Sequence, residues 1–112
     1  MSAESAETPA IVEHAEFTIT AGREAEFEQA FPRGEQALAK SPGYRWSRLI
    51  RQVENPSVYL LLVGWESLEA HMVIFRGSEL FTQWRGVVGE YFAAPPVVTH
   101  FGASDLSSGE IL

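Results

Sequence analysis

The stretch that decides the fold is residues 58–75, VYLLLVGWESLEAHMVIF, where an apolar segment ends in Trp65 and leads directly into a short amphipathic helix. Residues 58–63 are an unbroken series of branched, aromatic and leucine side chains, and the turn signal ENPS precedes them at 54–57. Because this series is too short for a buried helix, we interpret it as a central strand that is buried on both of its faces.

The helix that follows brings a histidine close to an aromatic side chain. Ser67 offers a hydroxyl that can cap the free N–H groups at the start of the helix. Leu68, Met72 and Phe75 recur at helical spacing, so His71 is expected on or beside the apolar face. The segment therefore predicts that a large aromatic ring and a titratable ring lie side by side.

The size and charge of the chain limit the classes of protein to which it can belong. A chain of 112 residues can bury one modest core, which predicts a single domain. The formal net charge of -7 and the scattered basic residues disfavour nucleic acid as a partner. The lack of cysteine excludes disulfides and cysteine catalysis. We expect a cytoplasmic protein without a membrane segment, because no secretory signal or membrane-length apolar stretch is present.

The two ends of the chain are expected to lie outside the domain. Residues 1–9 are small, polar and acidic and predict a disordered N-terminal tail, while residues 104–112 predict a C-terminal extension. Residues 10–103 then form the domain. Its first strand, residues 11–20, alternates in polarity as a sheet strand does. We place Ile11, Ala15, Phe17 and Ile19 on one side of this strand and Val12, His14, Glu16 and Thr18 on the other.

The remaining elements complete a recognisable order. Residues 23–40 predict an amphipathic helix, in which Pro32 is expected to cause a kink or break near Phe31. Residues 44–53 predict an edge strand. After the central strand, helical segments are expected up to about residue 91, and residues 97–103 form a last strand. The order β-α-β-β-α-β predicts an α+β fold, the ferredoxin-like plait with a four-stranded antiparallel sheet and both helices on one face.

A homodimer is expected from the apolar character of the central strand. A single plait leaves one face of its sheet bare, yet residues 58–63 are apolar on both faces. Face-to-face packing of two sheets in a symmetric dimer would cover the second face.

Residues 11–103 as a whole resemble the antibiotic biosynthesis monooxygenase (ABM) family of small dimeric α/β-barrel proteins. The resemblance depends on the order and spacing of short motifs, which are Gly22 with Glu26-Phe27, Pro42-Gly43-Tyr44, Trp65-Glu66-Ser67 with Ala70-His71, Ser78 to Phe81, and Val97 to Phe101. Membership implies the dimeric α/β-barrel fold but names no substrate, because the family includes oxygenases of anthrones and quinols, haem-degrading enzymes and an isomerase.

Two branches of the family can be compared with this chain residue by residue. The haem-degrading branch has an asparagine, a tryptophan and a histidine where this sequence holds Ala15, Ile74, and Trp84 or Arg85, so that activity is disfavoured. The anthrone-oxidising branch has a tryptophan that Trp65 matches. Its tyrosine, its asparagine and its helical arginine correspond here to His71, Leu61 and a position near Phe81.

The candidate catalytic residues are His71 and Trp65. A partly buried imidazole beside an aromatic pocket can take a proton near neutral pH, although a lone helical histidine is also a common packing residue. Trp65 could orient a planar substrate or simply fill the core. We expect the substrate pocket to be bordered by aromatic side chains, namely Phe17, Phe31, Phe75, Phe81, Trp84 and Tyr91. We place it where Pro32 and Gly34 loosen the packing of the first helix.

We predict neither a metal nor a cofactor. His14 and His100, on neighbouring strands, could face each other and bind a metal with Glu13 or Glu16, but no ligand spacing supports a site. The favoured hypothesis is a cofactor-independent monooxygenase that oxidises a small quinol- or anthrone-like aromatic with dioxygen. The alternative is a dimer that binds a small hydrophobic ligand without chemistry, and a haem-degrading enzyme is a weaker third.

Overall fold

The computed structural model describes residues 9–107, so residues 1–8 and 108–112 of the two predicted tails lie outside the described part of the chain. The elements, in chain order, are β1 (Ile11–Thr18), α1 (Glu24–Ala39), β2 (Tyr44–Arg51), β3 (Val58–Trp65), the π-helix η1 (Ala70–Phe75), α2 (Glu79–Val88), the 3-10 helix η2 (Gly89–Tyr91) and β4 (Val97–Gly102). The predicted order of strands and helices is confirmed.

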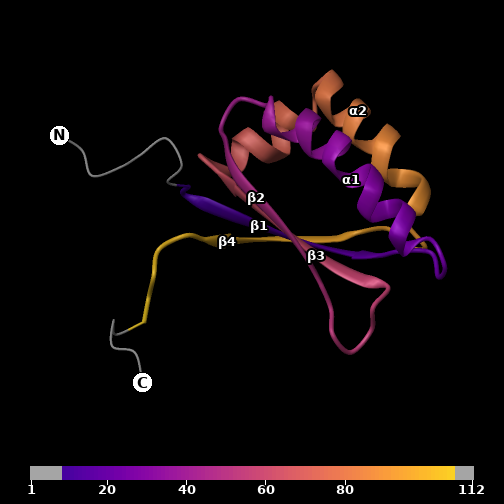
Figure 1. Ribbon diagram of the computed structural model, residues 1–112. Helices are drawn as coiled ribbons and strands as arrows, with labels where there is room; N and C mark the ends of the chain where they lie inside the picture. Colours follow the sequence, from indigo (N-terminus) through magenta and orange to yellow (C-terminus); the bar gives the residue numbers. More distant parts are fainter. Residues whose placement is uncertain (1–8, 108–112) are drawn as a thin grey trace.

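One antiparallel sheet carries both long helices on the same face (Figure 1). The strand order is β2-β3-β1-β4, so β3 is central and β2 is an edge strand, as the sequence predicts. This is the ferredoxin-like plait. No helix in the described range is long and apolar enough to span a bilayer.

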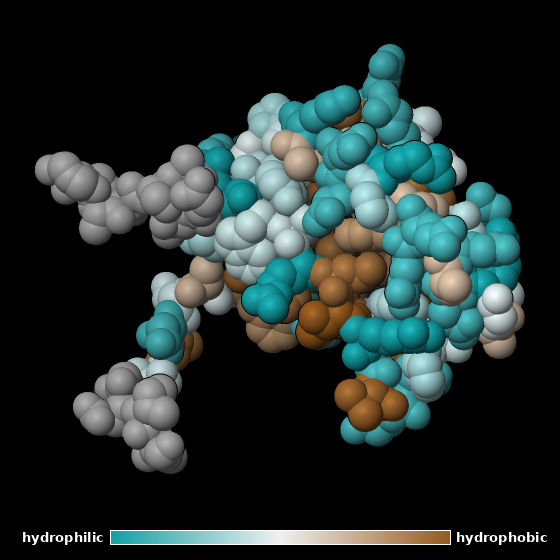
Figure 2. All heavy atoms as spheres, in the orientation of Figure 1, coloured by the Kyte–Doolittle hydropathy of each residue, from teal (hydrophilic) through white to brown (hydrophobic). Residues whose placement is uncertain are grey.

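The core lies between the helix layer and the sheet. Alternate residues of β1 and β3 face the helices, and the register pairs Ala15 with Leu61 and Phe17 with Tyr59. Phe27 of α1 is fully buried among these strands, with its ring 4.9 Å from that of Tyr59. Figure 2 shows hydrophobic residues gathered between the helices and the strands, within a mainly hydrophilic surface. The helices therefore cover the face to which the alternating apolar residues of β1 and β3 point.

The packing of α1 differs from the expectation at two positions. The helix continues through Pro32 without a break. Gly34 does not leave a void, because a Cβ atom there would lie only 3.1 Å from Trp84 Cε3 and 3.1 Å from Val88 Cγ1. The missing side chain lets α1 and α2 approach closely. The prediction that the pocket lies beneath Gly34 is therefore wrong, because neither Pro32 nor Gly34 lines the cavity that the structure contains.

The start of η1 is fixed by two local contacts. Ser67 Oγ accepts the N–H of Ala70 at 3.0 Å, which confirms the predicted helix cap. Gly43, at φ 89°, passes so close to this point that a Cβ atom would lie 2.6 Å from Ala70 Cβ. Only glycine tolerates both this backbone conformation and this approach. These contacts hold the N-terminal end of the π-helix against the start of β2.

Within residues 9–107, no helix covers the other face of the sheet. Its side chains include those of Trp46, Ile50, Leu60, Leu62 and Phe101, since these residues pair in register on one face. Ile50 is 46% exposed and Phe101 is 56% exposed. We call this surface the outer face.

Candidate active site

A buried carboxyl group forms the centre of the site. Glu13 belongs to the inward-facing side of β1 and is only 6% exposed. Its Oε1 accepts a hydrogen bond from Trp65 Nε1 at 2.9 Å, and His71 Nε2 lies 3.3 Å from the same oxygen. Among residues 9–107, Oε2 has no hydrogen-bond partner. Oε1 therefore lies next to two nitrogen atoms, and Oε2 is the carboxylate oxygen without a partner in this part of the chain.

The π-helix η1 inserts His71 between the carboxyl group and the last strand. The imidazole is 3% exposed and stacks on the indole of Trp65, with ring centroids 5.1 Å apart and planes 17° apart. Its Nδ1 lies 2.8 Å from Nε2 of His100, which is paired with Glu13 in the β1–β4 register. The three titratable groups form a chain from Glu13 through His71 to the half-buried His100.

Burial shifts the protonation of this chain toward uncharged groups. Desolvation raises the pKa of Glu13 to about 7, although the Trp65 hydrogen bond and the charge of Arg76 oppose the rise. Desolvation, together with the charges of Arg76 and His100, lowers the pKa of His71 to about 3. Burial also lowers the pKa of His100. Near neutral pH the imidazoles are uncharged, and Glu13 is the group that exchanges a proton.

One arrangement of hydrogens satisfies the whole chain when Glu13 is ionised. Trp65 donates to Oε1, and a proton on His71 Nε2, which lies 3.3 Å from the same oxygen, would face it. His71 Nδ1 becomes an acceptor, and His100 Nε2 donates to it. Trp65 therefore orients Glu13 through a direct hydrogen bond, while His71 packs against the carboxyl group and His100 fixes the tautomer of His71.

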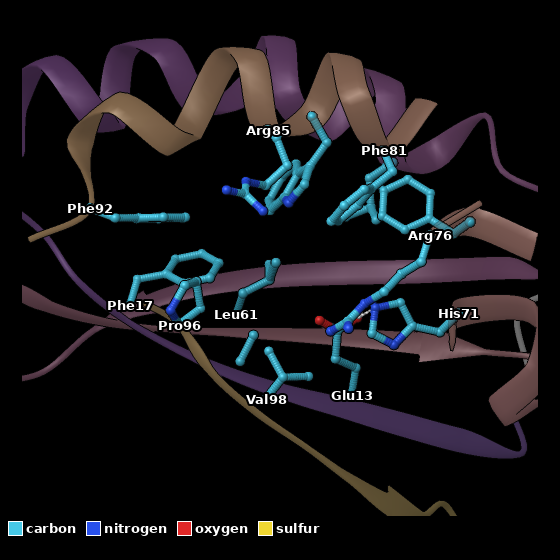
Figure 3. A pocket seen from close by; sticks show the side chains of 14 residues that line it. Glu13, Phe17, Leu61, His71, Arg76, Phe81, Arg85, Phe92, Pro96 and Val98 are labelled. Atoms are coloured by element: carbon cyan, nitrogen blue, oxygen red, sulfur yellow. Dashed lines mark ion pairs between the residues drawn. The ribbon is translucent and has the colours of Figure 1, made fainter. Parts of the chain in front are cut away.

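Glu13 and His71 lie at one end of an apolar cavity of about 150 Å³ (Figure 3). Its walls come from β1, β3, β4, α1, η1, α2 and the segment before β4. The side chains that line it are Glu13, Ala15, Phe17, Leu38, Leu61, His71, Phe75, Arg76, Phe81, Trp84, Arg85, Phe92, Pro96 and Val98. The cavity therefore has a largely aromatic wall, the titratable side chains of Glu13 and His71 at one end, and two arginine side chains.

The structure brings most of the predicted site residues together. Phe17, Phe75, Phe81 and Trp84 line the cavity beside His71. Trp65 is fully buried behind the imidazole and does not line the cavity. The other two predicted lining residues, Phe31 and Tyr91, belong to the core, where Phe31 packs against Trp84 and Tyr91 packs against Phe27.

The sequence interpretation missed Glu13 and His100 as members of this site. Glu13 alternates with Ala15 and Phe17 on the buried side of β1, and this pattern is visible in the sequence. A charged residue is nevertheless rarely assigned to a core position. The sequence suggests that His100 faces His14, and the observed register corrects that pairing. His14 pairs with Thr99 and points to the outer face, where its ring lies 5.6 Å from Phe101. Among residues 9–107, no group of three or more histidine, aspartate and glutamate side chains is arranged to hold a metal.

The fold and the site together define a small plait protein with an acid–imidazole cluster at the end of an aromatic cavity. The family model for antibiotic biosynthesis monooxygenases matches residues 10–87. The chain belongs to this family. It is also 37% identical over 83 residues to the uncharacterized protein YczJ of Bacillus subtilis, an alignment that covers 74% of this chain and 87% of YczJ.

Solved structures agree with this assignment. A Bordetella bronchiseptica protein, provisionally described as an antibiotic biosynthesis monooxygenase, is 38% identical with a TM-score of 0.82, over 87% of this chain and 99% of that one. SnoaB of Streptomyces nogalater, a cofactor-independent oxygenase, is 19% identical with a TM-score of 0.72, over 92% of this chain and 100% of that one. At that identity the likeness to SnoaB extends to the fold alone.

Proposed function

We propose that this protein is a cofactor-independent monooxygenase that oxidises a small electron-rich hydroxyaromatic with dioxygen. The observation that carries the proposal is a buried carboxyl group, with its pKa raised to about 7, at the end of an apolar aromatic cavity. A base of this strength is suited to proton transfer at neutral pH. SnoaB, which shares the fold, is a cofactor-independent oxygenase.

The first chemical step is removal of the phenolic proton. Oε2 of Glu13 is the acceptor, because Oε1 is held by the nitrogen atoms of Trp65 and His71. The sequence hypothesis assigned this role to His71 itself. The lowered pKa of His71 makes its imidazole the weaker base, so we assign it to orienting and stabilising the carboxylate. Catalysis thus depends on Glu13 and His71 as a pair.

The second step joins the substrate anion to dioxygen. An electron passes from the anion to dioxygen, and the two radicals combine to form a C–O bond at a ring carbon. The peroxide takes back the proton from Glu13. Loss of the proton on that carbon then breaks the O–O bond, so that a carbonyl forms and water leaves. The substrate supplies all four electrons, one oxygen atom enters the product, and the largely apolar lining of the cavity limits the water around the reactive anion.

Replacing His71 with alanine should lower the rate of oxygen uptake about 10- to 100-fold, because Glu13 loses the ring that packs against its carboxyl group and positions it. The measurement is oxygen uptake with a panel of hydroquinones and anthrones. Equal uptake by the wild type and the variant would contradict the role of His71. If the wild type binds these compounds without any uptake, the protein is a ligand-binding dimer and the enzymatic proposal is wrong.

We also propose that two chains form a homodimer through their outer faces. Leu60 and Leu62 lie on the central strand of this face and are only half-buried. Exposed Ile50 pairs with Leu60, and exposed Phe101 lies on the edge strand β4, beyond β1. A monomer that exposes such a patch is prone to associate, and a two-fold contact covers it with a second copy of itself.

Replacing Leu62 with lysine should convert the protein to a monomer, since each dimer would then bring two charges into one apolar contact. Sedimentation equilibrium at micromolar concentration should give twice the mass of one chain for the wild type and the mass of one chain for the variant. Val53→Lys is the matched control, because Val53 is 90% exposed at the β2–β3 turn. A monomeric wild type would overturn the proposed dimer.

A further inference from the structure

Two arginines line the cavity, although the rest of its wall is largely apolar. Arg76 follows η1 and Arg85 lies in α2, and their guanidinium carbons are 6.0 Å and 5.8 Å from the centre of the Phe81 ring. Among residues 9–107, neither forms an ion pair with a carboxylate, which leaves both guanidinium groups available to an anion in the cavity. Both side chains are exposed and both also line the cavity, so they stand where its wall meets the solvent.

The two arginines occupy different positions relative to the base. Figure 3 shows the side chain of Arg76 extending toward Glu13 and His71, while Arg85 enters from α2 on the opposite side of the cavity. The charge of Arg76 acts on both of these groups and on His100. Arg76 is therefore placed to stabilise an oxyanion that forms beside Glu13, and Arg85 is free to bind a second negative group.

The volume of the cavity limits what can enter. At about 150 Å³ it equals a volume that is known to bind benzene when it is lined by apolar side chains. One aromatic ring therefore fits inside, whereas the three fused rings of an anthrone would have to protrude. The aromatic side chains Phe17, Phe81 and Trp84 supply faces and edges for contact with a single ring.

We propose that the site takes a single-ring hydroxyaromatic acid, with its ring in the cavity, its hydroxyl group at Glu13 and Arg76, and its carboxylate on Arg85. This assignment rests on the proposed function, because it uses the same base and names its substrate class. The net charge of the chain is -7, so an anion is attracted by these two side chains and not by the protein as a whole.

Binding of 4-hydroxybenzoate, measured by calorimetry under nitrogen, tests the proposal without any turnover. The acid should bind about 10- to 100-fold more tightly than its neutral methyl ester, the range expected for a charge-assisted hydrogen bond to a carboxylate. Arg85→Gln should remove this preference, and Arg85→Lys should retain part of it. Arg33→Gln should leave it unchanged, since Arg33 is exposed on α1 and does not line the cavity.

Several results would overturn the proposal. Equal affinity of the wild type for acid and ester would show that no carboxylate site exists, and a full preference in Arg85→Gln would show that Arg85 does not form it. Tighter binding of anthracene-2-carboxylate than of 4-hydroxybenzoate would contradict the single-ring limit. A preference for the acid that depends on Arg85, in a protein that consumes no oxygen with 2,5-dihydroxybenzoate, would support the binding site and count against the monooxygenase.

Discussion

Glu13→Gln should lower oxygen uptake about 10²- to 10⁴-fold, the usual contribution of a general base in the right position. Glutamine has nearly the same shape and retains an oxygen that can accept the Trp65 N–H, so the cluster should keep its packing. It cannot take a proton from the substrate. The loss should therefore appear in kcat, and binding of 4-hydroxybenzoate under nitrogen should change far less.

The matched control for this variant is Glu54→Gln, which removes a carboxylate from the exposed β2–β3 turn and should retain wild-type uptake. The pH profile gives an independent test, because wild-type kcat/KM should rise as Glu13 loses its proton, with a midpoint near pH 7. Wild-type rates in Glu13→Gln, or a profile that is flat between pH 5 and pH 9, would show that Glu13 is not the base.

The fold could be predicted from the sequence because the deciding signals are local. The apolar series at the start of β3, the alternation along β1 and the turn between β2 and β3 each identify an element without reference to distant residues. Two local expectations needed correction. Pro32 does not break α1, since packing against α2 and the sheet outweighs one lost hydrogen bond. The region around His71 forms a π-helix, whose wider turn no periodicity of the sequence indicates.

The site was only partly predictable because it depends on long-range register. His71 and Trp65 are close in sequence, and their contact followed from the strand–helix junction. Glu13 and His100 join them only because β1 lies between β3 and β4 in the observed register. A shift of β4 by one residue would have turned His100 to the outer face. The charge of Glu13 also misled the interpretation, since a glutamate is rarely buried without a strong reason.

The buried cluster should also determine how stability varies with pH. Glu13 has a pKa of about 7 in the folded chain and about 4.5 when unfolded, so between these values the folded form holds a proton that the unfolded form has lost. Raising the pH through this window therefore destabilises the fold. His71 acts in the opposite sense. Its pKa is about 3 when folded and 6.5 when unfolded, so raising the pH through that window stabilises the fold.

In the wild type these two effects cancel between about pH 4.5 and 6.5, and Glu13→Gln removes only the destabilising one. The variant should match the wild type near pH 4 and exceed its unfolding free energy by about 3 kcal/mol above pH 7, which is the energy of ionising Glu13 in the folded chain. Urea unfolding at pH 4 and pH 8, at one protein concentration, measures the difference, and Glu54→Gln should follow the wild type at both. A variant no more stable than the wild type at pH 8 would mean that Glu13 ionises without cost, and its assignment as a base tuned by burial would fail with it.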